Sequence, residues 1–215
     1  MKYKLIIFDI DGTIVKHVSS WRYIHEKLGL WDDLAYKYQK KFLGGKISYR
    51  KFCELDAAHW KGLAEAKIIK IFNKAPYAKN AARCIKKLKI SGFKLAAIST
   101  GLQYMAERIK KEMKFDYTLY NRLLARDRKL TGGVKINITH GQKGRALKKI
   151  LKIMHIKPGE VISVGDSAGD IPLAKLSGYF IAFNSSDENL SRIADYNCKS
   201  RDFKEVYDKI ISISA

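Results

Sequence analysis

The sequence has few cysteines and no long apolar run, and both shortages exclude whole classes of protein. Its three cysteines are odd in number, far apart and outside any Cys-x-x-Cys spacing, which excludes a framework of disulfides or structural zinc. The first apolar run, Leu5 to Phe8, is cut off at Asp9, and no later run approaches the roughly 18 apolar residues that a membrane span requires. We therefore expect a cytoplasmic protein with reduced thiols and no membrane partner.

Acidic residues are also scarce, because 21 Asp and Glu stand against 42 Lys and Arg, which gives a formal net charge of +21. Such a charge favours an anionic partner, for example a nucleic acid. The lysines are spread along predicted helix faces, however, as in Lys86-Lys87, Lys110-Lys111 and Lys148-Lys149. Dispersed lysine is typical of a solvated face, so nucleic acid is an alternative partner and not the favoured one. The length suits one domain with an insertion, as a monomer or a homodimer.

Apolar spacing divides the chain into an α/β core and a helical insertion. Residues 16–75 show helical spacing, as in Trp21, Ile24 and Leu28, and contain no convincing strand. From Pro76 on, apolar strands alternate with amphipathic helices over short connections. We expect strands at 5–8, 93–98, 161–164 and 179–183, a hairpin within 117–134, and helices at 78–90, 102–114, 142–154, 170–177 and from 202.

This alternation predicts the fold class α/β, with a doubly wound, mostly parallel sheet. The sheet and its helices would take residues 1–15 and 76–215. Residues 16–75 would form a helical cap domain, inserted after the first strand.

The most informative stretch is Asp9-Ile10-Asp11-Gly12-Thr13, which follows the first apolar run directly. An apolar run followed by Asp-x-Asp-Gly is typical of a strand that ends in a tight turn. Side chains alternate along an extended segment, so we expect Asp9 and Asp11 to point the same way. Two such carboxylates repel each other unless a cation or a proton intervenes, and the pattern therefore indicates a metal site.

Three further segments with chemically active side chains follow expected strands or open expected helices, at the sheet edge where α/β proteins bind their ligands. Ser99-Thr100-Gly101 offers a hydroxyl and backbone N–H groups to an anion. Lys143 lies between two glycines and can approach a phosphate, and Gly165-Asp166 to Asp170 adds two carboxylates. Each segment alone could be a turn, a helix cap or a surface lysine. Their order at successive strand ends instead predicts a phosphoryl-transfer site.

These residues resemble the haloacid dehalogenase superfamily of aspartate-dependent phosphatases over nearly the whole chain. Asp9 to Thr13 is similar to its first motif, Ser99 to its second, Lys143 to its third, and Gly165-Asp166 to Asp170 to its fourth. The helical cap between the first two motifs resembles the phosphoserine phosphatase branch, as do Asn121-Arg122-Leu123 and Lys129-Leu130-Thr131-Gly132.

The resemblance implies a Mg²⁺-dependent phosphomonoester hydrolase that acts on a small phosphorylated metabolite. Asp9 would form an aspartyl-phosphate, while Asp11 would serve as general acid and then as general base. Mg²⁺ would be held by the Asp9 and Asp166 carboxylates and by the backbone carbonyl of Asp11. Lys143 and the segment Ser99, Thr100 and Gly101 would bind the phosphoryl oxygens, and Asp170 would support Lys143.

The cap departs from the phosphoserine branch, which holds the substrate's amino group with a glutamate and its carboxylate with an arginine. Val18 stands at the glutamate position, and the arginine position falls near Glu54. Arg50 lies four residues before Glu54 and could replace the arginine, or the two could simply pair with each other. Val18, Arg50 and Glu54 are therefore the candidate specificity residues, and phosphoserine is one candidate substrate among several.

Two other functions remain open on the sequence. A phosphatase for nucleic-acid phosphate ends or nucleotides would use the positive charge, and a non-catalytic binding protein would share the fold but not the intact motifs. The tryptophans Trp21, Trp31 and Trp60 all lie in the cap, where a hydrophobic core is the favoured explanation and a wall for a ligand is the alternative. Of the histidines, only His17 and His140 flank motifs closely enough to reach the site.

Overall fold

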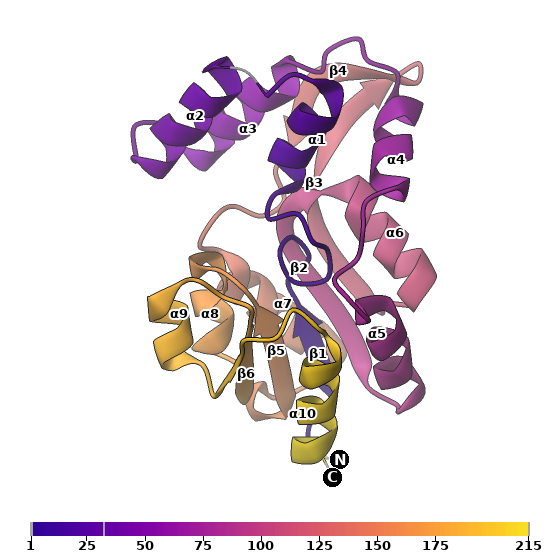
Figure 1. Ribbon diagram of the computed structural model, residues 1–215, viewed down its shortest axis with the longest axis vertical. Helices are drawn as coiled ribbons and strands as arrows, with labels where there is room; N and C mark the ends of the chain where they lie inside the picture. Colours follow the sequence, from indigo (N-terminus) through magenta and orange to yellow (C-terminus); the bar gives the residue numbers. More distant parts are fainter. Residues whose placement is uncertain (1, 32, 215) are drawn as a thin grey trace.

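The computed structural model describes residues 2–31 and 33–214. Its core is a seven-stranded sheet of order β4-β3-β2-β1-β5-β6-β7 (Figure 1). The strand pairs are parallel except for the antiparallel hairpin of β3 and β4. The strands are β1 (Leu5–Phe8), β2 (Lys94–Leu102), β3 (Tyr117–Arg126), β4 (Lys129–Lys135), β5 (Val161–Gly165), β6 (Tyr179–Phe183) and β7 (Tyr196–Cys198).

Helices cover both faces of this sheet, which confirms the predicted doubly wound α/β fold. One apolar cluster joins the sheet to α5 (Ala81–Ile90), α6 (Gln103–Met113) and α10 (Lys204–Ser214). A second cluster joins the other face to α7 (Lys143–Met154), α8 (Ile171–Ala174) and α9 (Glu188–Ile193). The alternating side chains of β1 explain this, because Ile6 and Phe8 enter the first cluster and Leu5 and Ile7 the second.

Four helices lie between β1 and α5, and they form the region predicted as a cap. They are α1 (Ser20–Leu28), α2 (Asp33–Leu43), α3 (Tyr49–Ala58) and α4 (Glu65–Asn73). Helices α1 to α3 stand beyond the carboxyl ends of the central strands, and α4 lies beside α6 (Figure 1). The boundaries at residues 15 and 76 stay a prediction.

The β3–β4 hairpin ties the cap to the sheet. Its turn is formed by Asp127 and Arg128, both of which have a positive φ, as a tight two-residue hairpin turn requires. The backbone N–H of Gly62 donates to the Leu130 carbonyl at 2.8 Å, and the N–H of Leu130 donates to the Leu63 carbonyl at 2.8 Å. The cap is therefore held by backbone hydrogen bonds as well as by its apolar contacts.

The elements differ from the expected ones in three places. Strand β2 runs on to Leu102 and so contains Ser99, Thr100 and Gly101, which were expected in a loop. The expected helix 170–177 is a 3₁₀ turn at Ala168–Asp170 followed by α8, and the short elements α9 and β7 were not predicted. No helix in the described part of the chain is long and apolar enough to cross a membrane.

Two of the three cap tryptophans, Trp21 and Trp60, are buried in the hydrophobic core, as predicted. Trp60 is fully buried and stacks against Trp21 with ring centroids 5.8 Å apart. Both belong to the same apolar cluster as the sheet residues, so the core of the cap is continuous with that of the sheet. Trp21 differs from Trp60 because it also lines the cavity described below.

A histidine and an aspartate are buried together inside the cap. His25 on α1 and Asp56 on α3 are 0% and 1% exposed, and His25 Nε2 lies 3.4 Å from Asp56 Oδ1. Burial raises the pKa of Asp56 above its usual value of 3.8, and the neighbouring His25 only partly offsets this shift.

We expect Asp56→Asn to change how stability depends on pH. Because the folded state raises the pKa of Asp56, its contribution to stability is greatest below pH 3.8 and falls as pH rises through the raised pKa. Asparagine does not titrate, so the stability of the variant relative to the wild type should rise with pH. Urea unfolding of both proteins at several pH values from 4 to 7 tests this, with the exposed Asp127→Asn as control. A difference that is constant with pH would contradict it.

Candidate active site

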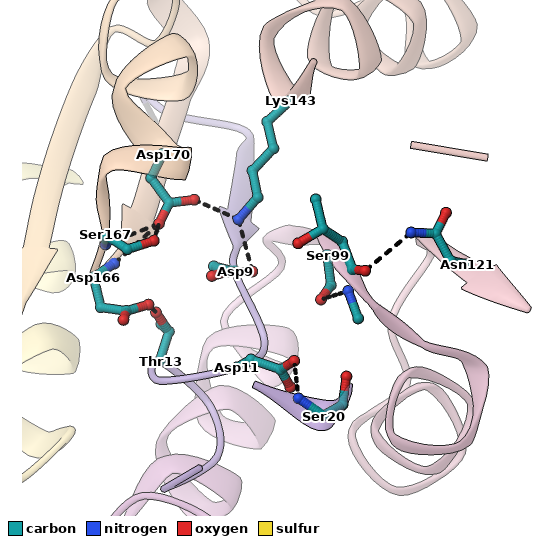
Figure 2. A network of polar contacts seen from close by, with 12 residues as sticks. Asp9, Asp11, Thr13, Ser20, Ser99, Asn121, Lys143, Asp166, Ser167 and Asp170 are labelled. Carbon is teal, nitrogen blue, oxygen red and sulfur yellow. Dashed lines mark hydrogen bonds and ion pairs between the residues drawn. The ribbon is translucent and has the colours of Figure 1, made fainter. Parts of the chain in front are cut away.

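The chemically active side chains meet at the carboxyl ends of β1, β2 and β5, where the predicted motifs were expected to converge. Asp9 and Asp11 follow β1, Ser99 lies near the end of β2, Lys143 opens α7, and Asp166 follows β5. These residues come from four different parts of the chain and surround one region of the molecule (Figure 2). Strand β1 lies between β2 and β5 at the centre of the sheet, so its end is where the loops of both neighbours converge.

Lys143 is the centre of this arrangement. Its Nζ lies 2.8 Å from Asp9 Oδ1 and 2.6 Å from Asp170 Oδ1, and all three side chains are buried (Figure 2). Burial lowers the pKa of Lys143, but the charges of Asp170 and Asp9 outweigh it and raise the pKa above its usual value. Lys143 is therefore a positively charged group that faces the carboxylate of Asp9.

The carboxylates of Asp9, Asp166 and Asp170 form an acidic cluster that one lysine does not neutralise. Each offers an oxygen, and these oxygens lie within 4.8 Å of one another. Burial raises the pKa of Asp9 well above its usual value, and Lys143 opposes this shift while Asp170 and Asp166 add to it. Burial and Asp170 also raise the pKa of Asp166 to about 7, despite its hydrogen bond from Thr13 Oγ1 at 2.9 Å.

This cluster suits a hard divalent cation, because it consists of oxygen ligands alone and contains more negative charge than its surroundings compensate. Gly12 shows how closely the backbone approaches it. The φ of Gly12 is +82°, and a Cβ at this position would collide with the carboxylate of Asp166. The turn after Asp11 therefore needs glycine both for its conformation and for the space beside Asp166.

The carboxylate of Asp11 has different neighbours from that of Asp9. Its Oδ2 accepts a hydrogen bond from the backbone N–H of Ser20 at 2.7 Å (Figure 2). Its Oδ1 lies 3.1 Å from His17 Nε2. Burial alone would raise the pKa of Asp11, but the hydrogen bonds from His17 and Ser20 outweigh it and lower the pKa.

The expectation that Asp9 and Asp11 point the same way assumed an extended segment. Strand β1 ends at Phe8, and the chain turns after it, so the alternation of a strand does not extend to Asp11. The side chain of Asp11 lies outside the acidic cluster of the described residues, and the backbone carbonyl of Asp11 stays a metal ligand that the family resemblance predicts.

The segment Ser99-Thr100-Gly101 lies beside Asp11 and is held by hydrogen bonds. Ser99 Oγ accepts a hydrogen bond from the Gly101 N–H at 2.9 Å, so the hydroxyl proton remains available to a ligand. A Cβ on Gly101 would collide with Ser20 Oγ and lie 2.6 Å from Asp11 Oδ2. Glycine is therefore required where the cap approaches β2.

The carbonyl of Thr100 accepts three hydrogen bonds, two of them from the cap. The donors are Trp21 Nε1 at 3.2 Å, Tyr49 Oη at 2.7 Å and Asn121 Nδ2 at 2.9 Å. Asn121 also accepts hydrogen bonds from the backbone N–H groups of residues 137 and 138, shortly before Lys143. The buried Asn121 thereby joins the second motif to the chain that leads to the third.

A cavity of about 210 Å³ opens above these residues, between the sheet edge and the cap. Of the predicted residues, Asp9, Asp11, Ser99, Thr100, Lys143 and Val18 line it, and so does His140. Arg50 and Glu54 are exposed and do not line it, so the structure does not bring these two candidate specificity residues to the site. His17 lies behind Asp11 and stacks on Tyr23 with centroids 4.4 Å apart.

Sequence reasoning missed part of the cavity wall. Ser19, Gln39, Phe42, Leu43, Tyr49 and Phe52 line it from the cap, together with Trp21. A wall for a ligand was the alternative prediction for the cap tryptophans, but the apolar spacing of residues that line a cavity is the same as that of core residues. Gln39 and Leu43 carry no sequence signal that separates them from other residues of an amphipathic helix.

Comparisons with known proteins agree with this geometry. The model of the haloacid dehalogenase-like hydrolase family matches residues 6–175. The phosphoserine phosphatase of Methanocaldococcus jannaschii is 32% identical over 206 residues, which cover 95% of this chain and 96% of that protein. The phosphoserine phosphatase of Archaeoglobus fulgidus is 30% identical over 89% of this chain and 55% of its own length.

Solved structures give the same result. A substrate-bound phosphoserine phosphatase complex superposes with a TM-score of 0.83 at 31% identity, covering 97% of this chain and 99% of the other. A phospho-aspartyl intermediate analogue of phosphoserine phosphatase superposes with a TM-score of 0.82, also at 31% identity and with the same coverage. The chain therefore belongs to the haloacid dehalogenase-like hydrolase family, as an enzyme of its phosphatase class.

Proposed function

We propose that this protein is a Mg²⁺-dependent phosphomonoester hydrolase that acts on a small phosphorylated substrate through an aspartyl-phosphate on Asp9. The observation that carries the proposal is the buried contact of Lys143 with Asp9, next to the acidic cluster and at the floor of the cavity. Such a site combines a carboxylate nucleophile with groups that bind phosphoryl oxygens. The names of the relatives make phosphoserine one candidate substrate.

In the first step, a carboxylate oxygen of Asp9 attacks phosphorus and the ester P–O bond breaks. Asp11 gives a proton to the leaving oxygen, so the product leaves as a neutral alcohol. Lys143 Nζ and Ser99 Oγ, with the adjoining Thr100 and Gly101, hold the phosphoryl oxygens. Burial raises the pKa of Asp9, and the nearby positive charge of Lys143 opposes this shift and so favours the ionised form that attacks phosphorus.

In the second step, Asp11 takes a proton from a water molecule, whose oxygen attacks phosphorus. The bond between Asp9 and phosphorus then breaks, and inorganic phosphate and the free Asp9 carboxylate are released. The lowered pKa of Asp11 favours its carboxylate form, which suits this role as base. The proton that Asp11 takes from the water molecule is the one that it gives to the leaving oxygen of the next substrate. Asp170 holds Lys143 in place through its contact of 2.6 Å.

The oxygen-only cluster fits Mg²⁺, which would be held by Asp9, Asp166 and the backbone carbonyl of Asp11. When bound, this ion supplies positive charge beside the phosphoryl group. The alternative of nucleic-acid ends or nucleotides is supported by the net charge of +21 alone. Among the described residues that line the cavity, Lys143 is the sole lysine or arginine, and it is paired with Asp9 and Asp170. The described lining residues therefore offer no further positive charge to the backbone of a nucleic acid.

We expect Mg²⁺ to raise the melting temperature of the wild type and Asp166→Ala to lose most of this effect. A ligand that binds only the folded state stabilises it by RT ln(1 + [L]/Kd), or about 2.7 kcal/mol at 100 times Kd. Thermal unfolding with Mg²⁺ and with chelator measures the shift, and the exposed Asp208→Ala serves as control. Equal shifts in the wild type and in Asp166→Ala would show that Asp166 is not a main ligand. Hydrolysis of a panel of phosphate esters, with and without Mg²⁺, tests the activity itself.

A further inference from the structure

The cap side of the cavity contains no charged side chain among the residues that the structure describes. The cap contributes Val18, Ser19, Trp21, Gln39, Phe42, Leu43, Tyr49 and Phe52. All of them are apolar, aromatic or neutral polar residues. The charged groups of the lining, Asp9, Asp11 and Lys143, belong to the floor of the cavity, where the phosphoryl group would lie.

The charges of the floor already have partners within the protein. Lys143 contacts Asp9 and Asp170, and Asp11 is held by His17 and the Ser20 N–H. These partners hold the charged groups of the floor where the phosphoryl group would lie. A substrate with an ammonium or a carboxylate in its leaving group would therefore meet no opposite charge there.

The cap wall is instead built from aromatic rings. Phe42 and Phe52 stack with centroids 5.2 Å apart and an interplanar angle of 16°, and Tyr49 meets Phe42 at 5.5 Å. The hydroxyl of Tyr49 is committed to the Thr100 carbonyl, so Tyr49 presents mainly its ring to the cavity. Such rings bind the apolar carbon surface of a ligand and offer little to a carboxylate.

The rim of the cavity is also apolar. Val18 and Leu43 both line the cavity, and they are 72% and 73% exposed, so apolar side chains stand at its opening. Neutral hydrogen-bonding groups come from Ser19 and from the amide of Gln39. A hydroxyl group can bond with either of these, whereas a charged group would lose its hydration without an adequate partner.

The charged cap residues next to the lining residues in sequence do not change this conclusion. Lys40, Lys41, Arg50, Lys51 and Glu54 are exposed and outside the lining, and Asp56 is buried against His25. We propose that the cavity selects phosphate monoesters of uncharged alcohols that combine an apolar carbon surface with hydroxyl groups, such as polyols or sugars. This inference rests on the proposed function and names the substrate class of the same site.

The test compares four alkyl phosphates of similar size. We would measure kcat/KM for glycerol 3-phosphate, phosphoethanolamine, phosphoglycolate and L-phosphoserine, with p-nitrophenyl phosphate as a measure of the core chemistry. We expect glycerol 3-phosphate to exceed each of the three charged-head esters at least tenfold. A smaller advantage, or a preference for any charged head, would overturn the inference while the proposed function stands. No Mg²⁺-dependent turnover of any ester would overturn both.

A variant with a new charge on the wall gives an independent test. Val18→Glu places a carboxylate at the exposed rim, where it should pair with an ammonium. We expect the ratio of kcat/KM for phosphoethanolamine to that for glycerol 3-phosphate to rise at least tenfold. Ile90→Glu is the matched control, because Ile90 is 85% exposed on α5 and outside the cavity lining. An unchanged ratio in a Val18→Glu protein with wild-type melting behaviour would overturn the inference, because the leaving group would then not be selected by this wall.

Discussion

Asp9→Asn should leave no measurable turnover of any phosphate ester, because an amide oxygen cannot form the aspartyl-phosphate. Enzymatic acceleration of phosphate-monoester hydrolysis reaches about 10²¹, so the reaction without its nucleophile is too slow to observe. The fold should survive, since asparagine has the same shape and Lys143 keeps its contact with Asp170 at 2.6 Å. Steady-state assays of a contaminant-free preparation and a thermal unfolding curve together measure both expectations.

Detection of the phosphorylated enzyme tests directly whether Asp9 is the nucleophile. Acid quenching of the wild type during turnover should trap a phosphorylated peptide that contains Asp9, and the same peptide of Asp9→Asn should carry no phosphate. Asp127→Asn is the control, because this side chain lies in the exposed β3–β4 turn. Substantial Mg²⁺-dependent activity in Asp9→Asn, or phosphate on another residue of the wild type, would rule out the covalent role of Asp9.

The fold was predictable from the sequence because its strands are continuous apolar runs and its helices are amphipathic. The strands Leu5 to Phe8 and Val161 to Gly165 are buried on both faces of the sheet, and such strands are rich in apolar residues. This composition distinguishes them from loops in the sequence. The extension of β2 to Leu102 had no such signal, since Ser99 to Gly101 are polar or small. These residues join the strand because Leu102 pairs with Asn121 on β3 and Asn121 bonds the Thr100 carbonyl. That is a tertiary contact, which a local pattern does not show.

The candidate site also has a part that was predictable from the sequence and a part that was not. Asp9, Lys143 and Asp166 could be placed because parallel strands bring their carboxyl ends to one edge of the sheet. The direction of the Asp11 side chain could not be predicted, because it is set by hydrogen bonds with His17 and with the Ser20 N–H in the turn after β1. The residues of the cap that line the cavity could not be predicted from the sequence either. Whether an aromatic residue of α2 or α3 faces the core or the cavity depends on how these helices pack, and both orientations give the same helical periodicity.

Lys143→Ala should destabilise the protein by about 3–5 kcal/mol, the usual cost of removing one partner from a buried ion pair. Lys143 is 3% exposed and is the cation that contacts both Asp9 and Asp170, so its loss leaves these carboxylates buried without it. A cation in the acidic cluster should restore part of this loss, because it supplies the missing positive charge. The deficit should therefore be smaller in Mg²⁺ than in chelator.

Urea unfolding of Lys143→Ala and of the wild type, each with Mg²⁺ and with chelator, measures both effects. Lys148→Ala is the matched control, because Lys148 lies on the same helix α7 and is exposed to solvent. Activity should fall with stability at Lys143 and stay unchanged at Lys148, since only the first lysine faces the cavity. A Lys143→Ala protein as stable as the wild type in chelator would mean that Asp9 and Asp170 do not need this lysine. The acidic cluster would then be relieved by protonation instead, and the site would require a different account of how Asp9 is kept ionised.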